Sequence, residues 1–257
     1  MSSVLESIIE GVREDLAKRK SITPNIEALA AGVAPAKDVA QCLSGTQIAI
    51  IAEVKRSSPS KGELAKISDP AALALEYQEA GAAVVSVLTE ERRFKGSIAD
   101  FKEVRQRIQI PMLRKDFTVD AYQVFESRAI GADLQLLIVA ALSISELKDF
   151  YQLGNELGLS TLFEVHSLEE LDIAMSLDPK IVGVNSRNLK NLAVDSSVFT
   201  EIIPRIPKNV IKVAESGISS RIEVAALETL GANAILVGET LVRAASAKLA
   251  ISQLLGR

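Results

Sequence analysis

Short apolar segments recur along the whole chain at intervals of about 20 to 35 residues. Most are apolar at consecutive positions instead of alternating with polar residues, which is typical of strands buried on both faces in a parallel sheet. The pattern predicts eight strands, at residues 48–53, 83–88, 111–114, 133–139, 161–165, 181–185, 210–214 and 234–238.

The segments between these strands are amphipathic at helical spacing. Several begin at a residue whose side-chain oxygen can cap a helix, such as Asp69, Ser143 and Ser219. Several end at a glycine, such as Gly81 or Gly231, which allows the left-handed backbone that ends a helix. They predict eight helices, at residues 70–80, 97–108, 120–130, 143–157, 167–177, 196–203, 219–230 and 246–255.

Eight strand–helix alternations predict an α/β protein whose parallel sheet closes into a single (β/α)8 TIM barrel over residues 48–257. An open doubly wound sheet is the alternative. That fold usually has a glycine-rich turn after its first strand, where this chain has EVKRSSPS. The apolar spacing within residues 1–47 predicts two helices, one at about 4–19 and one from 25 onward. We interpret them as a helical extension packed on the barrel, capping its N-terminal end.

Composition and charge exclude several classes of protein. The chain has 257 residues, 48% of them hydrophobic, and a net charge of −4. No basic run favours nucleic acid, and no apolar stretch approaches the roughly 18 residues of a membrane span. Because the N-terminus lacks the apolar core of a signal peptide, we expect a cytoplasmic protein. The single cysteine, Cys42, excludes an internal disulfide and is expected to act as a small apolar residue.

Polar and charged residues gather at the C-terminal ends of the predicted strands, where (β/α)8 barrels carry their chemistry. A charged side chain in an apolar strand costs free energy unless it has an ion-pair partner or a functional role. Because such residues recur at the same end of successive strands, we expect them to surround one functional site at that end of the barrel. These residues are Glu53, Lys55, Arg56, Arg114, Lys115, Asp116, Glu164, Asn185, Arg187, Glu215, Ser216 and Glu239.

This set of charges indicates an anionic ligand and acid–base chemistry. Local cations attract an anion even in an acidic protein, and a lysine and a glutamate can act as general acid and base. Crowded cations and burial would lower a lysine pKa, and an apolar wall would raise a glutamate pKa. Gly217 and Gly238 follow the last two strands, where backbone N–H groups often hold phosphate, so we expect a phosphorylated ligand.

Other polar residues receive structural interpretations. The only histidine, His166, is expected to serve at a helix start, and residues 90–93 are expected to form a solvated loop. Ser57, Ser58 and Ser60 lack the histidine–carboxylate arrangement that activates a serine nucleophile. No group of His, Cys and Asp residues has metal-ligand spacing, so we expect no metal.

Eight motifs resemble those of the indole-3-glycerol-phosphate synthase family. They are IAEVKRSSPSKG at 51–62, FKGS at 94–97, LRKDF at 113–117, LLIVAAL at 136–142, FEVH at 163–166, GVNSRNL at 183–189, AESGI at 214–218 and LVGE at 236–239. The first and third motifs are specific to that family, whereas the last two are shared more widely among phosphate-binding barrels. One departure is Asn188, where many members carry aspartate.

The resemblance implies a carboxy-lyase of tryptophan biosynthesis that needs no cofactor. It would convert 1-(2-carboxyphenylamino)-1-deoxyribulose 5-phosphate to indole-3-glycerol phosphate, with loss of carbon dioxide and water. By resemblance, Lys115 is the general acid for ring closure, Glu164 is the base for dehydration, and Lys55 contacts the substrate and protonates the departing hydroxyl. The resemblance also implies catalytic roles for Glu53, Asn185, Glu215 and Ser216, and substrate contacts for Arg56, Ser58, Phe94, Phe117, Arg187, Gly217, Gly238 and Glu239.

Two other functions remain as alternatives. Phosphoribosylanthranilate isomerase is another phosphate-binding barrel, but it relies on a cysteine–aspartate pair, and Cys42 precedes the first strand. A catalytically silent sugar-phosphate binder would need neither Lys115 nor Glu164. We expect a phosphorylated small-molecule substrate, no nucleic-acid or membrane partner, and a monomer.

Overall fold

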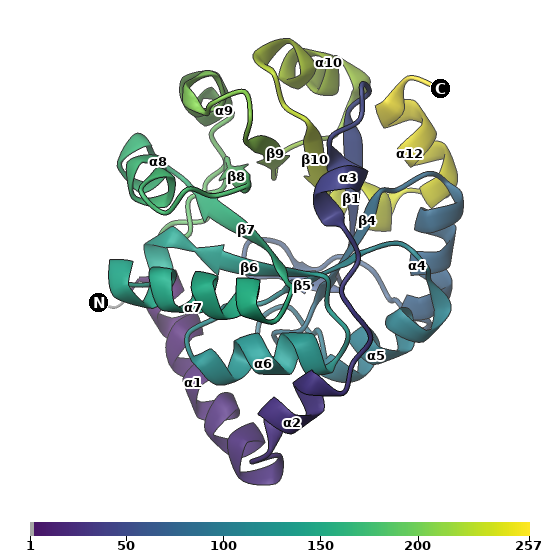
Figure 1. Ribbon diagram of the computed structural model, residues 1–257. Coiled ribbons are helices and arrows are strands. Elements are labelled where there is room, and N and C mark those ends of the chain that lie inside the picture. Colours follow the sequence, from purple (N-terminus) through teal and green to yellow (C-terminus); the bar gives the residue numbers. More distant parts are fainter. Residues whose placement is uncertain (1–2) are drawn as a thin grey trace.

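The computed structural model describes residues 3–257, and its centre is a closed barrel of eight parallel strands (Figure 1). Around the barrel the order is β1-β10-β9-β8-β7-β6-β5-β4, so each strand pairs with its neighbours along the chain and the last pairs with the first. The strands are β1 (Ala49–Val54), β4 (Val84–Leu88), β5 (Met112–Lys115), β6 (Leu134–Ile138), β7 (Ser160–Val165), β8 (Ile181–Asn185), β9 (Ile211–Glu215) and β10 (Ala234–Val237). The predicted (β/α)8 barrel is confirmed.

The helices between the strands cover the outside of the barrel. They are α4 (Pro70–Glu79), α5 (Ile98–Arg107), α6 (Ala121–Ala129), α7 (Ile144–Glu156), α8 (Leu168–Met175), α9 (Ser197–Ile202), α10 (Arg221–Leu230) and α12 (Ala247–Leu255). Asp69 and Ser143 cap their helices as predicted. Helix α10 is capped by Ser220, one residue later than predicted, because the Ser220 hydroxyl accepts the backbone N–H of Glu223.

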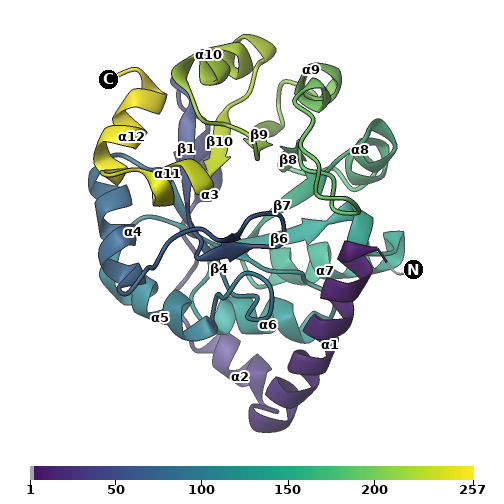
Figure 2. The ribbon, with the colours of Figure 1, turned by 180° about the vertical axis from the view of Figure 1, so that it is seen from behind.

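Several short elements were not predicted, because two to five residues are too few to show a period. They are the 3₁₀ helices η1 (Val139–Ala141) and η2 (Ile203–Arg205), the hairpin strands β2 (Ser57–Ser58) and β3 (Gly62–Glu63), and helix α11 (Glu239–Arg243). The hairpin follows β1 and α11 follows β10, so both lie at the C-terminal end of the barrel, which faces the viewer in Figure 2.

Apolar residues of each barrel strand divide between two packing layers. In β1, Ile51 packs inside the barrel with Leu113 and Leu134, whereas Ile50 packs outward with the covering helices. Successive side chains of a strand point to opposite faces, and here both faces are buried. This explains why the strands read as continuous apolar runs.

The N-terminal segment contacts both ends of the barrel. Helix α3 (Val39–Leu43) packs Val39 and Leu43 into the apolar cluster inside the barrel and lies across its N-terminal end (Figure 1). Helix α1 (Val4–Ile22) instead places Leu5 and Ile8 on the cavity at the opposite end. The expected cap therefore accounts for only one part of the extension, which also includes α2 (Ile26–Ala31).

The loop at residues 90–93 fastens α1 and is not a simple solvated loop. Glu90 is buried and accepts three backbone N–H groups, from Arg92, Arg93 and Phe94. The Arg92 guanidinium then pairs with Glu14 and with Asp15 of α1. A buried carboxylate that accepts several backbone bonds holds a loop in one conformation.

Two other expectations concern the surface. Cys42 is exposed on α3. The prediction that it packs as a small apolar residue is therefore wrong. Within residues 3–257, no helix is both long and apolar enough to cross a bilayer.

Candidate active site

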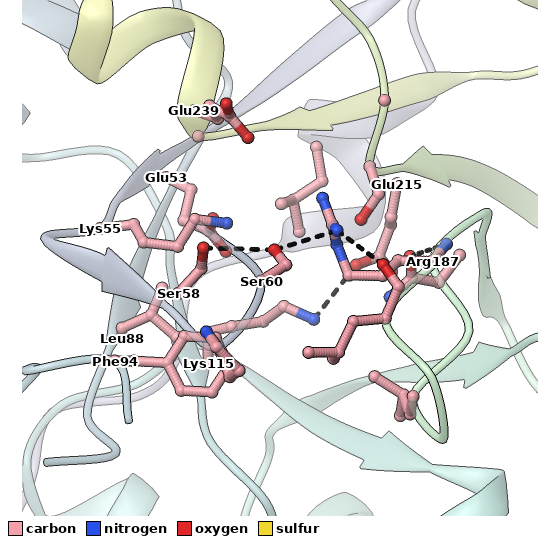
Figure 3. A pocket seen from close by; sticks show the side chains of 18 of the residues that line it. Glu53, Lys55, Ser58, Ser60, Leu88, Phe94, Lys115, Arg187, Glu215 and Glu239 are labelled. Carbon is pink, nitrogen blue, oxygen red and sulfur yellow. Dashed lines mark hydrogen bonds and ion pairs between the residues drawn. The ribbon is translucent and has the colours of Figure 1, made fainter. Parts of the chain in front are cut away.

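A cavity of about 570 Å³ opens at the C-terminal end of the barrel (Figure 3). It is lined by all but one of the residues to which a site role was assigned: Glu53, Lys55, Ser58, Phe94, Lys115, Phe117, Glu164, Asn185, Arg187, Glu215, Ser216, Gly217, Gly238 and Glu239. The carboxyl ends of parallel barrel strands meet at one rim, so residues far apart in sequence converge there.

Arg56 is the exception, because its side chain does not line the cavity and points to the outer helix layer instead. Its guanidinium pairs with Asp100 of α5, and its Nε donates to the carbonyl oxygen of Ile67. It therefore anchors the loop after β1 to the outer helix layer. Arg114 is also outside the cavity, because it precedes Lys115 in β5 and adjacent residues face opposite sides of a strand.

The Lys115 ammonium lies between two buried carboxylates. Its Nζ is 2.5 Å from Glu164 Oε2 on β7 and 3.1 Å from Glu215 Oε2 on β9. Both glutamates are 1% exposed. Charged groups that are removed from water need close partners of opposite charge. The ion pairs within this cluster therefore stabilise its buried charges.

These contacts reverse the expected pKa shifts of the acid–base pair. Burial opposes the charge of Lys115, but Glu164, Glu215 and Glu53 outweigh it and raise the Lys115 pKa. Burial alone would raise the pKa of Glu164, but Lys115 and His166 lower it. The sequence expectation was wrong because carboxylates, and not other cations, are the nearest neighbours of Lys115.

The Glu215 pKa shifts in the direction that the sequence predicted for a buried glutamate. Burial, together with repulsion from Glu164 and Glu53, outweighs Lys115 and raises the Glu215 pKa to about 8. The carboxylate fits only because position 183 on β8 is glycine: a Cβ there would lie 2.2 Å from Glu215 Oε1.

A second ion pair lies on β1 and the loop after it. Lys55 Nζ is 2.7 Å from Glu53 Oε2. A Cβ at Gly238 would lie 2.3 Å from the same carboxylate oxygen, so glycine at the end of β10 makes room for Glu53. The cavity thus contains two separate lysine–carboxylate groups, labelled in Figure 3 by Lys55 and Glu53 and by Lys115 and Glu215.

Loops from several strands close over these charges. Arg187 Nη1 donates to Ser60 Oγ at 3.1 Å, which connects the loop after β8 to the β2–β3 hairpin (Figure 3). Lys61 of the hairpin lies 3.1 Å from Glu239 at the start of α11. Asn185 donates to Glu164 Oε1 at 3.1 Å, so it orients the buried carboxylate.

The turn after β9 approaches the cavity through backbone conformations that few residues adopt. Ser216 and Gly217 are both left-handed, with φ of 68° and 72°. For a serine this conformation is strained, and such strain persists where surrounding structure enforces it. The adjacent turns after β9 and β10 are where barrels of this class bind phosphate through backbone groups.

An apolar wall lies beside the charged floor of the cavity. Phe94 and Phe117 have ring centroids 6.1 Å apart, and Leu5 and Ile8 of α1 line the same cavity. Apolar side chains with a few convergent charges suit a ligand that has an aromatic part and an anionic part. In the described part of the chain, no group of three or more His, Cys, Asp or Glu side chains is arranged to hold a metal ion.

Comparison with known proteins identifies the family. A family model described as Indole-3-glycerol phosphate synthase matches residues 5–254. The chain belongs to this family. A relative of that name from Arthrobacter sp. (strain FB24) is 50% identical, and the match covers 98% of this chain and 95% of the relative. One from Saccharopolyspora erythraea is 51% identical, covering 98% of this chain and 94% of the relative.

A more distant solved structure shares the barrel alone. A chain of the tryptophan synthase complex from Pyrococcus furiosus superposes with a TM-score of 0.62 at 19% identity, covering 82% of this chain and 99% of that chain. Identity this low shows the fold and says nothing of the chemistry.

Sequence reasoning missed some residues of this indole-3-glycerol phosphate synthase family site. Ser60, Lys61, Leu5 and Ile8 line the cavity, yet only the tertiary structure brings their segments to it. His166 was assigned a structural role, but its Nε2 lies 3.3 Å from Glu164 Oε1. His166 directly follows the end of β7, two residues after Glu164, so the FEVH motif already placed the two side chains near each other in the chain.

Proposed function

We propose that this chain is an indole-3-glycerol phosphate synthase acting in tryptophan biosynthesis. It would convert 1-(2-carboxyphenylamino)-1-deoxyribulose 5-phosphate to indole-3-glycerol phosphate, carbon dioxide and water. Family membership supports the reaction, and the observation that carries it is the Lys115 ammonium between Glu164 and Glu215 on the cavity floor. That arrangement provides a proton donor and a base within one enclosed space.

Ring closure requires a proton donor at the substrate carbonyl oxygen as a ring carbon attacks the carbonyl carbon. Lys115 is assigned this role, because the surrounding carboxylates raise its pKa and keep it protonated before the substrate arrives. Decarboxylation then restores the aromatic ring, so that step needs positioning more than proton transfer. Phe94 and Phe117 are assigned to hold the aromatic ring.

Dehydration requires an acid at the departing hydroxyl and a base at the neighbouring carbon. We assign Lys55 as that acid and Glu164 as that base. Once Lys115 has given up its proton, Glu164 loses a neighbouring positive charge and its basicity rises. Because Lys115 contacts Glu164, ring closure increases the basicity of Glu164 and so prepares it for dehydration, which follows.

The remaining groups bind and orient the substrate. Glu53 and Asn185 are assigned to the sugar hydroxyls and to the orientation of Lys55 and Glu164, and Arg187 to the substrate carboxylate. Ser216, Gly217, Gly238 and Glu239 are assigned to the phosphate through backbone groups, Ser58 to the substrate, and Glu215 to holding Lys115. No cofactor enters this proposal. We also propose that a monomer is active, because residues of this chain alone supply the acid, the base and the apolar wall that the reaction requires.

The test is a fluorescence assay for indole formation from the anilino-ribulose phosphate. The wild-type chain should form indole-3-glycerol phosphate without added metal or cofactor. A chain that binds the substrate without converting it would be a silent binder, and conversion of phosphoribosylanthranilate would favour the isomerase instead.

Replacing Lys115 separates binding from chemistry. In Lys115→Ala, ring closure should be lost while the Kd for substrate stays within about tenfold of wild type, because the proton is transferred only in the transition state. Single-turnover kinetics and equilibrium binding measure the two quantities. Ring closure at the wild-type rate would remove Lys115 from the mechanism.

Replacing Lys55 tests the second acid. In Lys55→Ala, ring closure and carbon dioxide release should continue, while the cyclised hydroxy intermediate accumulates because its hydroxyl lacks a proton donor. Rapid-quench chromatography measures the intermediate. A full dehydration rate in this variant would end the two-lysine assignment.

A further inference from the structure

His166 makes a contact with the proposed base that its position at a helix start does not require. Its Nε2 lies 3.3 Å from Glu164 Oε1, and its Nδ1 lies 3.0 Å from Glu170 Oε2 on α8. The imidazole side chain is only 10% exposed and does not line the cavity. It therefore stands behind Glu164, on the side away from the substrate.

Glu170 holds this imidazole in place. Its Oε2 accepts the backbone N–H of His166 at 2.8 Å as well as contacting the ring nitrogen. The result is a chain of carboxylate, imidazole and carboxylate from α8 to β7. An imidazole between two carboxylates favours its charged form, because each carboxylate attracts the added proton.

Glu164 needs a lasting counter-charge during the reaction. Its neighbours are Lys115 on β5, Glu215 on β9, Asn185 on β8 and His166. Ring closure discharges Lys115, which leaves a carboxylate that is 1% exposed beside another carboxyl group. Without a second cation, such a group would take up a proton before dehydration begins.

We propose that His166, as an imidazolium held by Glu170, is a positioning residue that keeps Glu164 ionised after Lys115 has given up its proton. This inference rests on the proposed function. Glu164 then has two cationic neighbours with different fates. Lys115 loses its charge when it donates its proton, whereas His166 keeps its charge throughout the reaction. Burial lowers the His166 pKa, but Glu164 and Glu170 outweigh it and raise the pKa to about 9, in agreement with this assignment.

The test is the pH profile of dehydration in His166→Gln, which keeps an amide near Glu164 but has no charge. The acidic limb of kcat should move upward by about one pH unit or more, because a nearby opposite charge shifts a carboxyl pKa by that amount. At pH 6 the cyclised hydroxy intermediate should accumulate, and at higher pH the rate should recover towards wild type with KM unchanged. Ring closure in a single turnover should remain at the wild-type rate.

Two further variants sharpen the result. Glu170→Gln leaves the imidazole in place but removes one of the two carboxylates that favour its charged form, so the acidic limb of kcat should move upward in the same direction as in His166→Gln, but by less. Glu169→Gln, on the same helix and exposed, is the matched control and should keep the wild-type profile.

The outcomes distinguish this inference from the function on which it rests. A wild-type chain that forms no indole product would remove the proposed function. A wild-type chain that turns over, with a His166→Gln profile reduced equally at every pH or unchanged, would overturn the role of His166 alone. If His166→Gln does not fold by circular dichroism, the acidic limb of Glu170→Gln decides the question: an upward shift supports the role of His166, and an unchanged limb overturns it.

Discussion

At the scale of single residues, the site depends on which charges touch which. Lys115, Glu164 and Glu215 form one buried group. Burial is the largest single influence on each pKa, but the neighbouring charges reverse its direction for Lys115 and Glu164 and add to it, through Glu164 and Glu53, for Glu215. His166 extends this group to the far side of Glu164. Each titratable side chain in such a cluster contributes to stability as well as to chemistry.

The raised pKa of His166 predicts how stability depends on pH. The folded state holds this proton up to a pKa of about 9, against 6.5 in the unfolded chain, so the contribution is complete below pH 6.5 and disappears as pH rises through 9. Urea unfolding of His166→Gln should show a decline between these pH values that is smaller by about 1 to 3 kcal/mol. An identical decline in both proteins would mean that His166 is neutral in the fold.

At the scale of secondary-structure elements, strand periodicity and glycine decide which side chains reach the cavity. Arg114 and Lys115 are adjacent in β5, yet one packs beneath α6 against Glu126 and the other enters the site. Gly183 and Gly238 lie beside Glu215 and Glu53, where a methyl group would take the place of a carboxylate oxygen.

Adding a methyl group at position 183 should displace Glu215. In Gly183→Ala the new Cβ would lie 2.2 Å from Glu215 Oε1 and 3.2 Å from Leu162 Cδ1, so the carboxylate must move away from Lys115. We expect kcat to fall by about tenfold or more, and stability by about 1 to 3 kcal/mol, as in overpacked interiors. Steady-state kinetics and urea unfolding measure both.

Gly158→Ala is the matched control for this change. Gly158 has a positive φ of 76° but open space around it, so the substitution strains the backbone without touching the site. It should cost stability while leaving kcat unchanged. A normal kcat in Gly183→Ala would show that the position of Glu215 is not needed for the reaction.

At the scale of the whole molecule, the N-terminal extension belongs to the site as well as to the scaffold. Helix α1 supplies Leu5 and Ile8 to the cavity and is fastened to the loop after β4 through Arg92 and to α6 through Arg19. Helix α3 caps the other end of the barrel. The extension therefore connects the two ends of the barrel over its outer surface, as Figures 1 and 2 show.

Releasing α1 should weaken substrate binding more than chemistry. In Arg92→Ala the pairs with Glu14 and Asp15 are lost, so Leu5 and Ile8 are held less firmly over the cavity. KM should rise several-fold, with kcat changed less, because the charged floor of the barrel is untouched. Lys18→Ala removes only an exposed pair with Asp15 and should leave both constants unchanged. A selective loss of kcat in Arg92→Ala would contradict this role for α1.

The sequence by itself determined the barrel and most of its rim. Apolar runs broken by helices specify alternating strands and helices, and charges that end those runs fall at one rim whatever the details of packing. Only the tertiary structure decided that Arg56 and Arg114 leave the cavity, that Leu5, Ile8, Ser60 and Lys61 enter it, and that Lys115 is surrounded by carboxylates. The reason is that contact energies depend on distances between residues far apart in the chain, which local patterns do not contain.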